Sequence, residues 1–523
     1  MAPRRKPVLL TLLLLLFPLA LVPGTPAVAA PAISALRFAD IPSGGVTLKA
    51  TVVTPAARGS YPAAIMPSSW GLNDLEYVAQ AKAFAARGYV VVSYTPRGWW
   101  LSGGEIDTAG PQDLADLSTV IDWALANTDA DPARIGAAGV SYGAGISLLG
   151  AGADSRIRAV GVLSGWTDLA YSLYGDETRH RQAADLLGIA ANLLGHPSAE
   201  LTDKLTDFAA NRDVDQVVTW ASTRSAATRL DQINANAPAV LIANAWGDSF
   251  FPPNQLTGFF DRLTGPKRLE LRPGDHAIAE LTGLAGLPND VWTSLARWFD
   301  QYLAGRDTGI GTEPAVQITP WNAPAEQYPT WAATSTATTR YGLGQIRTLD
   351  GTGLLGGAPT TGWTRALPTD RDTVANGGLV LITNGAAAFT GQRPWIWLPA
   401  VDRTRAGVWA AERPTSVKRL RGIPRLHVNL SGTDSTGTVV AYLYDLDLAG
   451  NASLITHAPA GWHTTAGGTR TLDLALGATA YDLPAGHSLT LVLDTTDPLY
   501  YDDNAPNRSI TITGGSYLDV PLR

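Results

Sequence analysis

The stretch RIGAAGVSYGAGISLLGAG, Arg134–Gly152, is the most informative segment of this 523-residue chain. A short apolar run ends at Val140, and Ser141 follows within a Gly-x-Ser-x-Gly pattern formed with Gly139 and Gly143. Glycine at both positions fits a sharp strand-to-helix turn that exposes a serine as a nucleophile. The chain contains 53 Gly, so the pattern alone could also be an ordinary glycine-rich connection. The surrounding sequence has to distinguish these two interpretations.

The sequence on both sides of this stretch alternates between two patterns. Short continuous apolar runs are typical of strands buried on both faces of a sheet, and between them apolar residues recur with helical spacing. This alternation predicts an α/β fold with a largely parallel sheet and helices on both faces. The expected strands are 61–66, 89–94, 134–140, 157–163, 239–244 and 268–272, the expected helices are 75–87, 114–126, 255–263 and 290–303, and 35–54 is expected to form an antiparallel pair.

Two regions depart from this alternation. Residues 166–236 are almost entirely helical in pattern, which indicates a helical cap inserted over one end of the sheet. After residue 305, short alternating runs separated by turn residues indicate an all-β sandwich or jelly roll. We therefore predict an α/β domain formed by 30–165 and 237–305, a cap formed by 166–236, and a C-terminal β domain formed by 306–523 that includes a linking segment.

A serine hydroxyl needs a base, and a group that orients this base, before it can attack a carbonyl. When a serine lies on such a turn, an acid and then a histidine are expected after later strands. His276, one of seven histidines, follows the last expected strand in PGDHAIAE. Asp248 follows the preceding strand in AWGDSFFPP, at the carboxyl edge where catalytic groups gather. Asp275 and Asp168 are the alternatives for the acid, and an ordinary surface-loop histidine is the alternative for His276.

The sequence also predicts N–H donors for an oxyanion near Ser141. The Tyr142 N–H lies at the N-terminus of the following helix, where developing negative charge is stabilised. A second donor is expected from the loop after strand 61–66, and the backbone N–H groups of Ser69 and Trp70 are equal candidates. A hydroxyl from Ser68 or Ser69 is a further alternative.

The first 29 residues have the parts of a secretory signal peptide: a basic segment (4–6), an apolar run (8–22) and small residues at the cleavage site (27–29). The mature chain would carry 36 basic and 46 acidic residues, and its net charge of −10 argues against nucleic acid as a partner. The chain has no cysteine, which excludes disulfides and thiolate chemistry. We expect a secreted protein without a membrane anchor after cleavage, with no metal and no cofactor.

Together these motifs resemble those of the X-Pro dipeptidyl-peptidase and cocaine esterase family of α/β-hydrolases. The resemblance implies a capped α/β-hydrolase domain followed by a jelly roll, and it implies a Ser141, Asp248 and His276 triad. The sequence departs from the family at Ser68, where a tyrosine hydroxyl usually helps to bind the oxyanion, and at Thr95, where an aspartate is usual. The matching segments are YTPRGWWLSGGE (94–105), DPARIGAAGVSYGAG (131–145), LSGWTDL (163–169), AWGDSFFPP (245–253), GDHA (274–277) and YDLPAGHSLTLVL (481–493).

The substrate is less defined than the reaction. A dipeptidyl peptidase binds the free α-amine of its substrate, and Asp176 and Glu177 are candidates for that contact, with solvated helix charges as the alternative interpretation. Trp166 and Phe250 are candidate walls of the substrate pocket, with core packing as the alternative. We predict a serine hydrolase acting on a small peptide or ester, dipeptidyl-peptidase-like ahead of a carboxylesterase of the cocaine-esterase type.

A hypothesis from another class is a polymer-binding protein with a vestigial hydrolase domain. Such a protein would stack sugar rings on exposed tryptophans of the β domain, and Trp395, Trp397 and Trp462 are the candidates. The complete Ser, Asp and His set argues against a vestigial enzyme.

Overall fold

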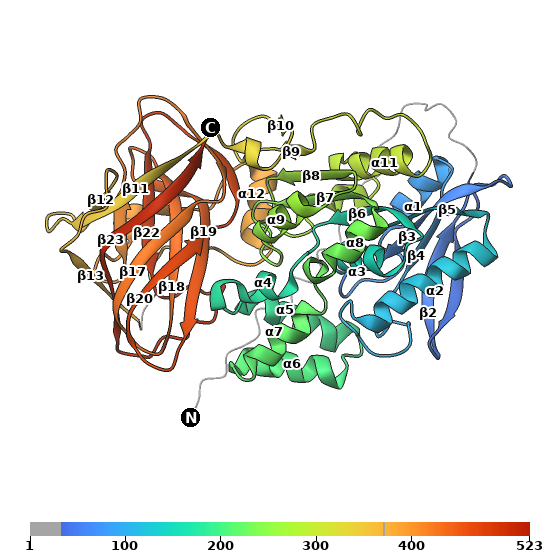
Figure 1. Cartoon of the computed structure of the whole chain (residues 1–523), viewed down its shortest axis with the longest axis horizontal. Coiled ribbons are helices and arrows are strands. Elements are labelled where there is room, and N and C mark those ends of the chain that lie inside the picture. Colours follow the sequence, from blue (N-terminus) through green and yellow to red (C-terminus); the bar gives the residue numbers. More distant parts are fainter. Residues whose placement is uncertain (1–32, 370–371) are drawn as a thin grey trace.

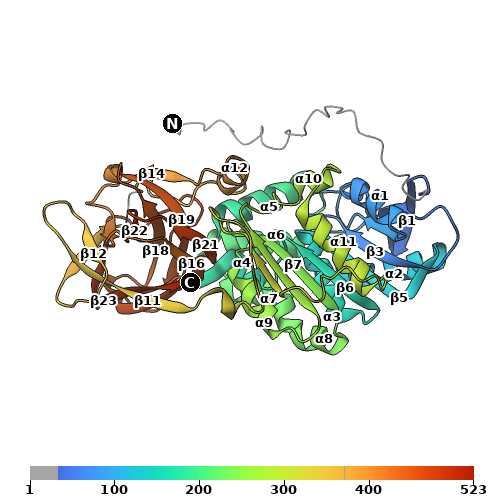
Figure 2. The same ribbon diagram turned by 90° about the horizontal axis from the view of Figure 1, so that it is seen from above.

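The computed structural model describes residues 33–369 and 372–523, which form an α/β domain, a helical cap and a β domain (Figure 1). The α/β domain and the β domain lie at opposite ends of the molecule (Figures 1 and 2). The expected signal peptide, residues 1–29, lies outside the described residues. Within the described residues, no helix has both the length and the apolar character needed to cross a membrane.

The α/β domain is built on one ten-stranded sheet. The pairs from β4 to β9 are parallel, whereas β1, β2 and β10 are antiparallel strands at the two ends. This arrangement brings the carboxyl ends of β3, β5, β7 and β8 to one edge. In spatial order the strands are β1 (Arg37–Ser43), β2 (Val46–Val53), β4 (Val90–Tyr94), β3 (Tyr61–Pro67), β5 (Ala130–Val140), β6 (Ile157–Leu163), β7 (Ala239–Ala245), β8 (Lys267–Arg272), β9 (Val316–Ile318) and β10 (Glu326–Tyr328).

Helices cover both faces of this sheet. Successive side chains of a strand point to opposite faces, so each strand contributes apolar side chains to both layers. In β3, Ala63 and Ile65 pack on one face, and Ala64 and Met66 pack on the other. Both faces are therefore apolar, which explains the continuous apolar runs in the sequence. The first face is covered by α2 (Pro111–Asn127), α3 (Tyr142–Ala153), α8 (Leu230–Asn236) and α9 (Asn254–Arg262), and the second by α1 (Val78–Ala86) and α11 (Asp290–Tyr302), with α10 (Leu281–Leu284) beside α1.

Four α-helices form the cap: α4 (Leu169–Tyr174), α5 (Arg181–Leu194), α6 (Ala199–Ala210) and α7 (Val214–Ser222). They enclose a small core of Ala184, Phe208 and Val217. The prediction that the cap extends to residue 236 is wrong, because α8 packs against α3, where Ile233 contacts Gly152. Helix α8 therefore belongs to the α/β domain.

The β domain is a two-layer sandwich formed by a sheet of 13 strands that folds over itself (Figure 1). The inner faces enclose an apolar core that includes Trp409, Leu443 and Ile512. The predicted fold class, a capped α/β-hydrolase sheet followed by an all-β domain, is confirmed. The strands are β11 (Ala337–Ile346), β12 (Gly353–Leu355), β13 (Thr364–Pro368), β14 (Trp395–Trp397), β15 (Gly407–Ala410), β16 (Lys418–Gly422), β17 (Arg425–Thr433), β18 (Thr436–Leu446), β19 (Asn451–His463), β20 (Gly468–Ala475), β21 (Thr479–Leu483), β22 (Ser488–Asp494) and β23 (Ser509–Leu522).

The β domain differs from the sequence-based prediction in three respects. Strands β9 and β10 follow residue 305 but extend the α/β sheet, so the boundary lies after Tyr328. Among the three candidate stacking residues, Trp395 and Trp397 are 59% and 54% exposed, but Trp462 is 3% exposed and belongs to the core. The β domain also contains a helix, α12 (Ile382–Thr390), which the sequence analysis did not predict.

Candidate active site

Ser141 occupies a strained turn between β5 and α3. Its φ of 57° and ψ of −116° lie in a region that non-glycine residues rarely adopt. The flanking glycines make this turn possible: a Cβ on Gly139 would lie 2.6 Å from the carbonyl carbon of Gly143, and a Cβ on Gly143 would lie 2.0 Å from the Pro67 oxygen. The Gly-x-Ser-x-Gly stretch therefore has the strained strand-turn-helix geometry of a nucleophile elbow.

His276 and Asp248 continue from Ser141 in one line of hydrogen bonds. His276 Nε2 lies 2.8 Å from Ser141 Oγ, and His276 Nδ1 lies 3.0 Å from Asp248 Oδ2. Asp248 follows β7 and His276 follows β8, so the parallel strands deliver both side chains to the sheet edge where β5 ends. All three side chains are buried, which strengthens the electrostatic interactions between them.

Backbone donors fix the orientation of the Asp248 carboxylate. Its Oδ1 accepts the N–H groups of Phe250 at 2.9 Å and Phe251 at 2.7 Å, which leaves Oδ2 for His276. The rings of Phe250 and Phe251 pack on the imidazole, with centroid separations of 4.8 and 5.0 Å. The imidazole is therefore held between a fixed carboxylate and two aromatic rings.

The two alternative acids have other contacts. Asp275 Oδ1 accepts hydrogen bonds from Ser249 N, Ser249 Oγ and His276 N, at 2.7 to 2.8 Å. It thus joins the loop of Asp248 to the loop of His276 without contacting the imidazole. Asp168 accepts the N–H of Tyr171 and caps α4.

Buried carboxyl groups surround the histidine. Burial disfavours the imidazolium form of His276, but the charge of Asp248 and its hydrogen bond outweigh this effect, so the His276 pKa is raised above its ordinary value. Burial also raises the pKa of Asp275 and the pKa of Glu280 to about 6. Glu280 accepts a hydrogen bond from Ser164 Oγ, which accepts the N–H of Ala277 beside the histidine.

The expected oxyanion donors differ in availability. The Tyr142 N–H is at the first position of α3, where backbone N–H groups have no partner within the helix. No hydrogen bond of the Trp70 N–H is found among the described residues. The Ser69 N–H, in contrast, donates to Glu76 Oε2 at 2.7 Å. Ser69 therefore has no free N–H for an oxyanion, and Trp70 is the remaining candidate in this loop.

The hydroxyl groups of the same loop are also engaged. Ser68 Oγ donates to the Leu72 carbonyl. Ser69 Oγ lies 2.9 Å from the Val140 oxygen and 2.6 Å from Glu76 Oε1, and a single hydroxyl proton can serve only one of them. Because burial raises the Glu76 pKa to about 7, a protonated Glu76 can donate to Ser69 Oγ, which then donates to Val140. Glu76 fixes the loop that carries Trp70.

The candidate substrate contacts fall into two groups. Trp166 and Phe250 lie beside the Ser141 site: Trp166 stacks on Tyr142, and its Nε1 is bound by the Arg224 carbonyl. Asp176 and Glu177 instead face the β domain, where Glu177 Oε2 accepts the N–H of His463 in β19. The structure brings the two aromatic residues to the site, but it does not bring the two carboxylates there.

Sequence reasoning missed three residues that support the site. Each of them holds a loop of the site through a hydrogen bond. Glu76 holds the loop of Trp70, Ser249 holds the loop of Asp248, and Glu280 holds the loop of His276. The longest of these bonds joins residues 116 positions apart. Their sequence neighbourhoods are ordinary, so no local signal identifies them. Within residues 33–369 and 372–523, no group of three or more His, Cys, Asp or Glu side chains is arranged to hold a metal ion.

A serine elbow at the carboxyl edge of a β1-β2-β4-β3-β5-β6-β7-β8 sheet defines the α/β-hydrolase class. Residues 44–278 match the family model of X-Pro dipeptidyl-peptidase (S15 family). Residues 307–518 match the model of the X-Pro dipeptidyl-peptidase C-terminal non-catalytic domain. The chain belongs to this family and is a serine hydrolase.

Solved structures show the same two-domain fold at low sequence identity. An α-amino acid ester hydrolase is 17% identical, with a TM-score of 0.72 and coverage of 95% of this chain and 98% of that chain. An aminopeptidase from a marine sediment archaeon, Thaumarchaeota archaeon, is 15% identical, with a TM-score of 0.67 and coverage of 96% and 98%. A CocE/NonD family hydrolase from Staphylococcus aureus is 13% identical, with a TM-score of 0.69 and coverage of 94% and 93%.

Among curated proteins, the uncharacterized protein YcjY of Escherichia coli K12 is 36% identical over 101 residues. This match covers 18% of the present chain and 31% of YcjY, so it spans less than a third of that relative.

Proposed function

We propose that this serine hydrolase cleaves its substrate through an acyl-enzyme intermediate formed on Ser141. The hydrogen-bonded line from Ser141 through His276 to Asp248 carries this proposal. His276 removes the Ser141 proton as Oγ attacks the carbonyl, and it returns this proton to the leaving group. Asp248 keeps the Nδ1 proton in place and stabilises the imidazolium. Water then attacks the acyl-enzyme, and the acid is released.

The developing oxyanion is bound by backbone N–H groups in this proposal. Tyr142 and Trp70 supply these N–H groups. The alternatives are already engaged: Ser68 Oγ donates to the Leu72 carbonyl, and Ser69 donates its N–H to Glu76 and its hydroxyl to the Val140 carbonyl. Two backbone donors, of which Tyr142 lies at the N-terminus of α3, are sufficient for acyl transfer, since each donor typically contributes about 10²–10³ in rate.

For the substrate, we propose a carboxylic ester with an apolar acyl group. Trp166, Phe250 and Phe251 provide apolar surface beside the histidine. Glu177, a candidate for binding a substrate α-amine, is already bound to β19, and this contact favours an ester without a free amine over an X-Pro dipeptide. The second candidate is X-Pro dipeptidyl-peptidase activity, which the family models favour.

One experiment tests both the mechanism and the substrate class. The mature chain and its Ser141→Ala variant are assayed with short-chain 4-nitrophenyl esters and with X-Pro 4-nitroanilides, and both are treated with a fluorescent fluorophosphonate. We expect ester hydrolysis and labelling of the parent chain, and loss of both in Ser141→Ala. Activity retained in Ser141→Ala would exclude the mechanism, whereas cleavage of nitroanilides at a higher kcat/KM than esters would establish the peptidase alternative.

We also propose that residues 1–29 form a signal peptide and that the protein is secreted. The basic, apolar and small-residue segments of the sequence support this proposal. N-terminal sequencing of protein from the culture medium should begin at Ala30, and recovery of an intact Met1 terminus only from inside the cells would refute it.

A further inference from the structure

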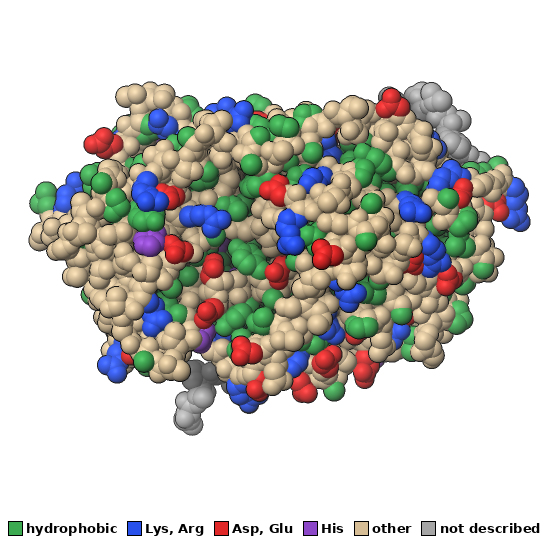
Figure 3. Space-filling model, viewed as in Figure 1, with side chains coloured by type: hydrophobic (Ala, Val, Ile, Leu, Met, Phe, Trp, Pro, Cys, Tyr) green, Lys and Arg blue, Asp and Glu red, His purple; other side chains and the backbone are tan. Residues whose placement is uncertain are grey.

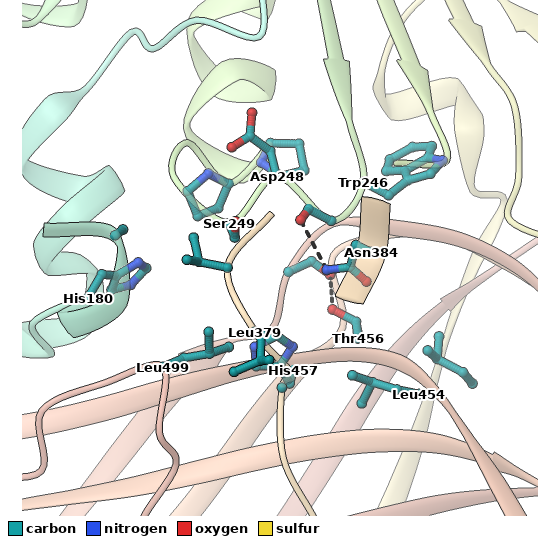
Figure 4. Close-up of a pocket in the computed structure, with 18 of the residues that line it drawn as sticks. His180, Trp246, Asp248, Ser249, Leu379, Asn384, Leu454, Thr456, His457 and Leu499 are labelled. Carbon is teal, nitrogen blue, oxygen red and sulfur yellow. Dashed lines mark hydrogen bonds between the residues drawn. The ribbon is translucent and has the colours of Figure 1, made fainter. Parts of the chain in front are cut away.

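A cavity of about 80 Å³ lies where the α/β domain, the cap and the β domain meet. Ser249 and Trp246 line it from the α/β domain, His180 from the cap, and His457 and Leu499 from the β domain (Figure 4). Ser141 and His276 are not among its lining residues, whereas Asp248 is, so the cavity lies on the Asp248 side of the hydrogen-bonded line. The surface of the molecule is hollowed along the boundary between these parts (Figure 3).

Arg393 brings a positive charge to this cavity. Its guanidinium stacks on Trp321 at 3.6 Å from the ring centroid, and its three nitrogens donate to the Leu454 and Ile455 carbonyls and to Asn384 Oδ1. These bonds use three of the five N–H donors of an arginine. Two donors therefore remain, and the stacking holds the guanidinium plane in a fixed orientation.

No carboxylate within the described residues forms a salt bridge with Arg393. Burial lowers the Arg393 pKa to about 9. Arg393 is half-buried, and charges withdrawn from water in proteins are normally paired, because an unpaired one is costly. Two other partly buried arginines, Arg365 and Arg403, each have an aspartate whose charge opposes the burial effect. Arg393 thus differs from them as a cation for which the described residues supply no acidic partner.

The other groups on the cavity wall favour a carboxylate with a short apolar part. Asp248 is the one acidic residue in the lining, and its two oxygens already bind His276 and backbone N–H groups. His180 and His457 add imidazoles, and the pKa values of both are lowered, to about 3 and about 4, first by burial and then by neighbouring positive charge. Leu379 and Leu499 supply apolar surface, and Asn384 and Leu454 lie on the side opposite His180 (Figure 4).

We propose that this interdomain cavity binds a small carboxylate anion, with Arg393 as its charge partner. One water needs about 10–15 Å³ on this measure of volume, so the cavity accommodates an acid of acetate or propionate size. Such a ligand would contact the α/β domain, the cap and the β domain at once. This proposal does not rest on the proposed hydrolase function, although Asp248 and Ser249 lie on the cavity wall.

Equilibrium dialysis of the full mature chain against radiolabelled acetate, at pH 7 and constant ionic strength set with chloride, tests this proposal. The Ser141→Ala variant is measured in parallel, because acetate binding to it would show that the site does not depend on catalysis. We expect saturable binding of one acetate per chain in both proteins. Absence of saturable binding, or displacement of acetate by an equal concentration of chloride, would overturn the proposal.

Two substitutions assign the binding to Arg393. Arg393→Met keeps the length of the side chain and removes the charge, and a charge-assisted bond worth about 1.5–3 kcal/mol corresponds to binding that is roughly 10- to 100-fold weaker. The matched control is Arg403→Met, since Arg403 also binds two backbone carbonyls but does not line the cavity. Equal effects of both substitutions would contradict the assignment. If Arg393→Met does not fold, Arg393→Gln removes the charge while its amide can still donate hydrogen bonds, and unweakened acetate binding to it would also contradict the assignment.

Discussion

Replacement of Asp248 by asparagine should abolish most activity while the site keeps its shape. The parent Oδ1 accepts two backbone N–H groups, from Phe250 and Phe251. An asparagine must present its carbonyl oxygen to these donors, because its NH₂ group cannot accept them. The NH₂ group then occupies the position of Oδ2, 3.0 Å from His276 Nδ1.

This geometry forces His276 into the wrong tautomer. Nδ1 must accept a hydrogen bond from the asparagine NH₂, so the single proton of the neutral ring moves to Nε2, which faces Ser141 Oγ at 2.8 Å. A protonated Nε2 cannot remove the serine proton. We expect kcat for a 4-nitrophenyl ester to fall by about 10⁴, which corresponds to about 5.5 kcal/mol of transition-state stabilisation.

The matched control is Asp275→Asn, which makes the same chemical change 27 positions away in the neighbouring loop. Asp275 accepts all its hydrogen bonds through Oδ1 and does not touch the imidazole, so an asparagine oxygen can replace it. We expect a loss of less than about tenfold. Steady-state kinetics and thermal unfolding are measured for both variants. A larger loss in Asp275→Asn than in Asp248→Asn, with both proteins folded, would refute the assignment of Asp248 as the orienting acid.

Three further results are expected. The kcat/KM of ester hydrolysis should fall as pH is lowered through an apparent pKa above 6.5, because His276 must be neutral to accept the serine proton and its pKa is raised; a midpoint below 6.5 would contradict this. The free energy of unfolding should decrease as pH rises from about 4.5 to about 7, because the folded state retains the Glu76 proton that the unfolded chain has released. Urea titrations of Glu76→Gln should show a flatter pH dependence. Glu76→Ala should also lower kcat. Gly143→Ala should reduce stability by about 1–3 kcal/mol, because its Cβ would lie 2.0 Å from the Pro67 oxygen, whereas Gly258→Ala in α9, with no atom within 4 Å, should be neutral or stabilising by thermal unfolding.

The sequence of this protein determined its local structure and the order of its elements. Continuous apolar runs predicted β3 to β8 because both faces of the sheet are covered, and helical spacing predicted the cap. Gly139 and Gly143 predicted the turn at Ser141, since both positions are sterically closed to a side chain. The order of Ser141, Asp248 and His276 along the chain predicted that they would meet, because parallel strands end at one edge of a sheet.

Only the tertiary structure decided which distant groups these residues contact. The sequence could not show that Ser69 would lose its N–H to Glu76, that Asp275 would join two loops, or that Glu177 would bind β19. Nor could it show that β9 and β10 would join the α/β sheet, or that Arg393 would lie in a cavity without an acidic partner among the described residues. Hydropathy periodicity reports which face of an element is buried. It does not report which distant polar group lies opposite, and that choice depends on how the domains pack.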